Sequence, residues 1–140
     1  MKVYLIGSLR NPEIARVASV LRANALEVFD DWRAPGPETD DHWQAYCKTR
    51  GLCFRKALEG HHARHVFAID KQHLDDSQAA LMVLPAGKSA HLELGYMVGR
   101  GRPAFILLDK EPERFDIMYN FATGVSSSLD EILSWLAKYR

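Results

Sequence analysis

The chain has 140 residues, of which 47% are hydrophobic and 26% charged, as expected for one globular domain spanning residues 1–140. Its 18 basic and 18 acidic side chains give a formal net charge of zero, so nothing favours a nucleic-acid polymer or a membrane surface as partner. No apolar run approaches the roughly 18 residues that span a bilayer, and the two cysteines occur without a secretory signal, which favours a reducing, cytoplasmic location.

The first third of the chain predicts two strands with a helix between them. Residues 3–6 form a short apolar run that ends at Gly7, as a buried strand does. Asn11-Pro12-Glu13 is a typical helix start, and an apolar face with helical spacing follows it: Ile14, Val17, Ala18 and Leu21. Residues 26–29 predict the second strand, and residues 30–41 a polar loop.

Residues 42–78 have a helical but irregular pattern, in which Gly60 is expected to separate two helices. Residues 79–84 form an uninterrupted apolar run closed by Pro85, which is typical of a strand buried on both faces. Ser89 is the expected N-cap of a helix that runs to about residue 99.

The last elements are two strands and a helix. Residues 103–108 predict another buried strand, and a short fifth strand is expected near residues 122–125. Residues 128–131, Ser-Leu-Asp-Glu, form a capping box at the start of the last helix.

Strands that alternate with helices predict a parallel sheet covered by helices on both faces. Right-handed crossovers and the size favour a flavodoxin-like, doubly wound α/β sheet of about five strands in the order 2-1-3-4-5. Such sheets bind ligands beyond the carboxyl ends of the strands, where the first and third strands lie side by side. Residues 7–10 and 85–89 form the two loops at that place, so the candidate site is expected there.

The first of these loops contains Gly7, Ser8 and Arg10 before a helix start. Glycine permits close approach of the backbone to a ligand, free N–H groups at a helix start attract anions, and Ser8 and Arg10 can add bonds to a phosphate. A plain turn with a surface arginine explains the same residues equally well. The loop is neither a Walker loop nor a GxGxxG fingerprint.

The second loop contains Gly87 and Ser89 and leads to Glu93, expected within about the first turn of a helix. The helix dipole stabilises an ionised acid there, and an ionised glutamate beside a bound sugar is also a nucleophile. Asp70, before the third strand, is the second candidate acid.

Several other polar and aromatic side chains have an ordinary structural explanation. His61, His62 and His65 have no acid or cysteine at ligand spacing, so a solvated helix face is favoured and no metal or cofactor is expected. The aromatic residues around the polar loop either stack on a base or cover the sheet edge: Trp32, Trp43 and Tyr46.

Taken together over residues 3–108, these segments resemble the nucleoside 2-deoxyribosyltransferase superfamily, and in particular its 2'-deoxynucleoside 5'-phosphate N-hydrolase branch. The resemblance lies in the order and spacing of Tyr4-Leu-Ile-Gly7-Ser8-Leu-Arg10, Asp70, the run from Ser89 through Glu93 to Tyr96, and Gly101-Arg-Pro103. Two departures stand out: Gln78 replaces a frequent acid, and the segment before Glu93 is one residue shorter than in the hydrolase branch.

Members of this superfamily cleave the N-glycosidic bond between a base and its sugar. The resemblance implies that Glu93 attacks C1' and carries the sugar as an ester, that Asp70 protonates the leaving base, and that Tyr4 orients Glu93. It also places Ser8, Arg10 and Ser89 near positions that hold a 5'-phosphate. Water as acceptor of the sugar makes the enzyme a hydrolase, and a second base makes it a transferase.

The expected function is therefore cleavage of a nucleoside or nucleotide, with a small molecule as the only ligand. A nucleotide-binding sensor without turnover is the alternative, and the presence of both Glu93 and Asp70 favours the enzyme. Relatives of this kind assemble so that one subunit helps close another's pocket. A homodimer or larger even assembly is therefore expected, with apolar surface around Gly95, Met97 and Gly99.

Overall fold

The computed structural model describes all 140 residues and contains one sheet of five parallel strands. The strands lie in the order β2-β1-β3-β4-β5, which confirms the expected flavodoxin-like topology. Their bounds are β1 (Lys2–Ile6), β2 (Glu27–Phe29), β3 (Ala79–Val83), β4 (Ala104–Leu107) and β5 (Gly124–Ser126).

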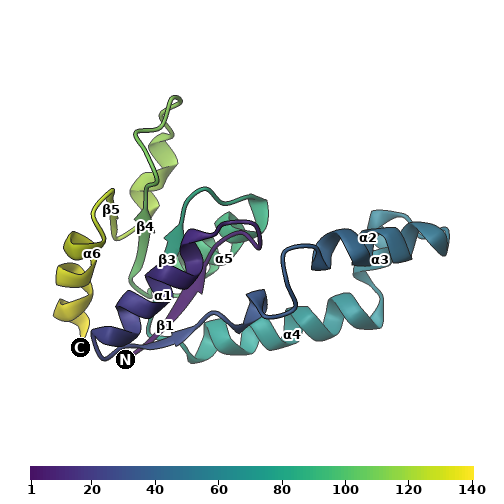
Figure 1. The fold of residues 1–140 in the computed structure, drawn as a ribbon, viewed down its shortest axis with the longest axis horizontal. Helices are drawn as coiled ribbons and strands as arrows, with labels where there is room; N and C mark the ends of the chain where they lie inside the picture. The colour runs from purple at the N-terminus through teal and green to yellow at the C-terminus, as the bar shows by residue number, and fades with distance from the viewer.

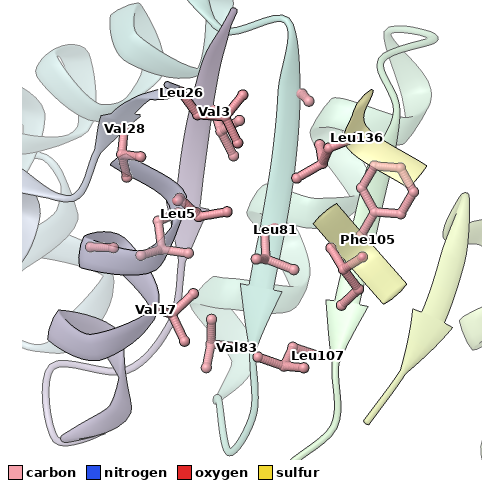
Figure 2. Close-up of a cluster of buried hydrophobic side chains, with 14 of the residues drawn as sticks. Val3, Leu5, Val17, Leu26, Val28, Leu81, Val83, Phe105, Leu107 and Leu136 are labelled. Carbon is pink, nitrogen blue, oxygen red and sulfur yellow. The ribbon is translucent and has the colours of Figure 1, made fainter. Parts of the chain in front are cut away.

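Helices cover both faces of the sheet (Figure 1). On one face, α1 (Glu13–Ala23) and α6 (Leu129–Leu136) pack on alternate strand residues, among them Leu5, Leu81 and Phe105 (Figure 2). On the other, α4 (His61–Asp76) and α5 (Lys88–Gly99) cover the remaining alternate residues: Tyr4, Ile6, Ala80, Met82 and Ile106. The period-two alternation of strand side chains thus assigns Tyr4 to the face covered by α4 and α5.

The segment between β2 and β3 extends away from the sheet as a helical arm (Figure 1). After the short 3-10 helix η1 (Asp31–Arg33), it contains α2 (Thr39–Thr49), α3 (Phe54–Leu58) and the first part of α4. We use "the arm" for residues 39–69. Its helices bury few side chains, and several large apolar side chains remain exposed: Tyr46, Phe54, Leu58, Val66, Phe67 and Ile69.

The arm corrects two expectations. Residues 42–78 form three helices rather than two, because Gly51, with φ +70°, ends α2 early, while Gly60 precedes α4 as expected. The polar loop is shorter than expected, since α2 already begins at Thr39. None of the helices in the chain has the length and apolar character needed to cross a membrane.

Two details of the remaining helices also differ from expectation. Gly87 rather than Ser89 is the N-cap of α5, and Met97 is fully buried in the core instead of contributing to an apolar surface. In the capping box, the Ser128 hydroxyl accepts from the backbone N–H of Glu131 at 3.3 Å, but the Glu131 carboxylate bonds to the Ser126 hydroxyl instead of returning to Ser128. The chain ends in the 3-10 helix η3 (Ala137–Tyr139), and η2 (Ile117–Phe121) precedes β5.

Candidate active site

The loop after β1 is fixed by its own contacts. A Cβ atom on Gly7 would lie 2.3 Å from Ile14 Cδ1, so the packing of α1 requires glycine at this position. The Ser8 hydroxyl accepts from the backbone N–H of Arg10 at 3.2 Å. The Arg10 guanidinium pairs with Asp41 at the start of α2, and both side chains are more than half exposed. The two side chains expected to bind a phosphate therefore already have partners within the chain.

Asn11 joins this loop to the loop after β3, a role that the sequence did not indicate. Its buried side-chain amide donates to the carbonyl oxygens of Val83 at 3.4 Å and Pro85 at 3.5 Å. Its Oδ1 accepts from the backbone N–H of Glu13 at 3.0 Å, but α1 begins at Glu13, one residue later than expected, with Pro12 instead of Asn11 as its N-cap. The only available signal was a short polar residue in the loop that follows the first strand, near the edge where the third strand also ends.

Glu93 lies farther along its helix than expected. It is the sixth residue of α5, beyond the first turn, where the free backbone N–H groups of a helix start are no longer within reach. Its Oε2 is buried without a hydrogen-bond partner. Burial, together with the charge of Asp70, raises the pKa of Glu93 to about 7, although the Tyr4 hydroxyl opposes this rise. Because Oε2 has no partner, any bond from Tyr4 goes to the other carboxyl oxygen.

Tyr4 and Asp70 face Glu93 from two other elements. Tyr4, on β1, is 1% exposed, and its burial raises its pKa above the ordinary value, followed by the negative charges of Glu93 and Asp70. Tyr4 therefore remains a protonated donor. Asp70 lies on α4 and is partly buried; burial raises its pKa, and His73 opposes the rise. The fold thus brings together three candidates that are far apart in the sequence.

Burial raises the pKa of both carboxyl groups, and the charge of Asp70 adds to the rise at Glu93. This corrects the expectation of a Glu93 kept ionised by the helix dipole: in the free protein, burial stabilises a proton on Glu93 near neutral pH. Two neighbouring carboxyl groups, one ionised and one protonated, supply a nucleophile and an acid.

Gly87 and Ser89 lie at the amino-terminal end of α5, beyond the carboxyl end of β3. Both are exposed, and a Cβ atom on Gly87 would meet no other atom within 4 Å, so the space around this backbone is open. The Gly87 carbonyl accepts from Nδ1 of His91 at 2.7 Å. The loop is therefore held in place while its outer side stays accessible to a ligand.

Gln78 lies at the opposite edge of the sheet. Its side-chain oxygen accepts from the backbone N–H of Lys2 at 2.6 Å, at the amino ends of β1 and β3. The departure from the superfamily pattern at this position therefore does not alter the candidate site.

The aromatic residues around η1 and α2 lie in two different places. Trp32 Nε1 donates to the Leu5 carbonyl at 2.8 Å, and the ring packs against the core, so Trp32 covers the sheet edge. Trp43 and Tyr46 instead line a cavity of about 740 Å³ within the arm, together with His42, Arg50, His61 and His62.

Neither this cavity nor a second one of about 320 Å³, between α5 and residues 116–122, is lined by Glu93. No group of three or more His, Cys, Asp or Glu side chains is arranged to hold a metal ion.

Two solved structures share this fold. One is a 2-deoxyribosyltransferase from Bacillus psychrosaccharolyticus, with a TM-score of 0.66 and 18% sequence identity over 95% of this chain and 90% of that one. The other is a CMP N-glycosidase from Clostridium botulinum, with a TM-score of 0.55 and 14% identity over 98% of this chain and 99% of that one. No protein-family model and no curated protein sequence matches the chain.

Proposed function

We propose that residues 1–140 act as one catalytic domain that cleaves the N-glycosidic bond of a nucleoside or its 5'-monophosphate. The observation that carries the proposal is the buried, unpartnered Oε2 of Glu93 beside Tyr4 and Asp70, on the face of the sheet that α4 and α5 cover. The reactions named for the two proteins of similar fold, deoxyribosyl transfer and cleavage of CMP, both act on such a bond. Neither of the proposed steps requires a cofactor.

The proposed reaction has two steps. An N-glycosidic bond breaks through an oxocarbenium-like transition state, which a carboxylate beneath C1' stabilises and then traps. Glu93 forms the new C1'–O bond while the C1'–N bond breaks, and its electron pair leaves with the base, which takes a proton from Asp70. In the second step water or another base attacks C1' and gives its proton to the Asp70 carboxylate, while the C1'–O bond breaks and the Glu93 carboxylate is released.

The raised pKa of Glu93 adds a proton shift before the first step. Glu93 must lose its proton to become a nucleophile, and Asp70 must have one to act as the acid. Transfer of this proton from Glu93 to Asp70 on substrate binding would prepare both groups at once. Tyr4, which stays protonated, then donates to the ionised Glu93 and holds its orientation.

The backbone of Gly7 and Gly87, with the side chains of Ser8, Arg10 and Ser89, is the proposed binding surface for the sugar and its 5'-substituent. In this part of the site a phosphate competes with Asp41 for Arg10. The strength of the Arg10–Asp41 pair therefore decides how much more tightly the site binds a monophosphate than a nucleoside.

We also propose that the chain forms a homodimer or larger even assembly through the arm. Val66, Phe67 and Ile69 are exposed on α4 immediately before Asp70. Contiguous exposed apolar side chains of this kind commonly mark interaction surfaces. A second copy packed there would also cover the open side of the candidate site.

A chromatographic assay for free base, over a panel of nucleosides and 5'-monophosphates, tests the proposed function. Glu93→Gln should lower turnover by orders of magnitude while ligand binding persists. Asp70→Asn should have its largest effect, roughly 10²–10⁴-fold, on bases that leave poorly without protonation. A slow substrate should leave a glycosyl adduct on Glu93, visible in the intact mass. Binding without release of base from any compound would instead support a nucleotide sensor.

A further inference from the structure

Four side chains join α4 to α5 just beyond the candidate carboxyl groups. Asp75 Oδ1 accepts from the Tyr96 hydroxyl and from Arg100 Nη1, both at 2.6 Å. Asp75 Oδ2 accepts from Lys71 Nζ at 2.8 Å. The Lys71 and Arg100 cations also lie over the Tyr96 ring, each 5.6 Å from its centroid. We call this group, Lys71, Asp75, Tyr96 and Arg100, the α4–α5 clasp.

The clasp is a network rather than a single surface ion pair. Hydrogen bonds from Lys71 and Tyr96 lower the pKa of Asp75, and the bond to Asp75 raises the pKa of Lys71, so both are charged near neutral pH. Isolated exposed pairs contribute little to stability, whereas several charges in one network with charge-assisted hydrogen bonds hold a defined geometry.

Few other contacts position α4 on the sheet. Leu74 is the only buried residue of this helix. The neighbouring His73 ring stacks on Phe29 with centroids 3.7 Å apart, and its Nδ1 lies 3.0 Å from Lys2 Nζ. All of these contacts involve the last turn of α4, so the polar contacts of residues 73 and 75 decide where the preceding turn, with Asp70, lies.

We propose that the clasp is a positioning device that sets the separation of the Asp70 and Glu93 carboxyl groups, an inference that rests on the proposed function. Along α5, Tyr96 follows Glu93 by three residues and lies on the same side of the helix. Along α4, Lys71 is next to Asp70, and Asp75 follows one turn after Lys71. Because each helix is rigid over one turn, the clasp fixes the position of the carboxyl group that lies about one turn away on the same helix.

Tyr96 and Asp75 act in this proposal through Asp70 and Glu93, without touching the substrate. A displacement of about 1 Å between reacting groups can lower a rate by about 10²-fold, so a clasp that holds the two helices in register matters for turnover even if it adds little stability.

The decisive variant is Tyr96→Phe, which removes only the hydroxyl bonded to Asp75. Its matched control is Tyr119→Phe, which removes a hydroxyl that contacts the same helix through His91 Nε2 at 2.8 Å but does not contact Asp75. In the base-release assay, we expect Tyr96→Phe to lower kcat at least about tenfold with little change in KM, most strongly for bases that leave poorly. The control should retain the kcat of the parent.

A carboxyl-selective NMR titration tests the clasp without turnover. The titratable groups that act on Glu93 are Tyr4 from β1 and Asp70 from α4, and His73 acts on Asp70. If Tyr96→Phe lets Asp70 move away, the pKa of Glu93 should fall in that variant and stay unchanged in Tyr119→Phe. Asp75→Asn provides a second variant with the same expected direction, should Tyr96→Phe fail to fold.

The outcomes separate the two proposals. If the parent protein releases no base from any substrate, the proposed function is wrong. The titration still decides in that case whether the clasp positions the two carboxyl groups. The inference would be overturned if the parent is active and both Tyr96→Phe and Asp75→Asn have the same kcat and the same Glu93 pKa as the parent. The clasp would then only stabilise the fold.

Discussion

The substitution Glu93→Gln should change the pH dependence of stability, independently of any effect on turnover. Glutamine has nearly the size and shape of glutamate but carries no titrating proton. In the parent, the Glu93 carboxyl is buried with one oxygen unpartnered, so its ionised form is unfavourable in the folded state. The variant removes this charge and leaves the surrounding packing in place.

The magnitude follows from the two pKa values of this group. The pKa of Glu93 is about 7 in the folded protein against an ordinary value of 4.5, a difference of about 2.5. Each pKa unit corresponds to about 1.36 kcal/mol, which gives about 3 kcal/mol. Since the folded state binds the proton more tightly, the parent loses this stability as the pH rises from about 4.5 to about 7. Below that range both states are protonated and the penalty is absent.

Urea unfolding of parent and variant at a series of pH values from 4.5 to 8.5 measures this effect. The free energy of unfolding of Glu93→Gln, relative to the parent, should increase by about 3 kcal/mol across the range. Glu13→Gln is a suitable control, because Glu13 is half exposed on α1 and bonds only to Arg16. Stability curves of Glu93→Gln and parent that run parallel over the whole range would refute the protonated, buried Glu93.

Two further predictions concern ligand charge and assembly. In a competition assay, Arg10→Ala should weaken the binding of a 5'-monophosphate by roughly 1.5–3 kcal/mol and the binding of a nucleoside far less. Asp41→Asn should strengthen the binding of the monophosphate, because it releases Arg10. Equal changes in binding for both ligands would exclude a phosphate contact. Light scattering should show a dimer or larger even assembly, whose interface should bury well over ~1,000 Å². Phe67→Lys should disrupt this assembly. A monomeric parent in concentrated solution would contradict the proposed interface.

The centre of the sheet could be predicted from the sequence because β3 and β4 are buried on both faces. Residues 79–84 and 103–108 had to be unbroken apolar runs, and helical patterns between the runs implied parallel crossovers. The arm could not be predicted in the same way. Its helices make few packing contacts and bury few side chains. α2, α3 and the first part of α4 therefore lack the continuous apolar face that marks a core helix.

The candidate site was only partly accessible from the sequence. The resemblance brought together Tyr4, Asp70 and Glu93, and the strand order explains why they can meet. The raised pKa of Glu93 could not be predicted, since the burial that causes it depends on contacts between distant parts of the chain. The role of Asp75 was equally hidden, because an acid in a polar helix is usually solvated, and its bonds to Tyr96 and Arg100 depend on how α5 docks against α4.

The shortness of the outermost strands determines how copies of this protein can associate. β2 and β5, at the two edges of the sheet, have three residues each, while the interior strands have four or five. A three-residue edge offers very few free backbone donors and acceptors on which another chain could add a strand. Open-ended growth of the sheet from molecule to molecule is therefore disfavoured. Self-association is left to helical surfaces, whose contacts can close into finite, symmetric particles.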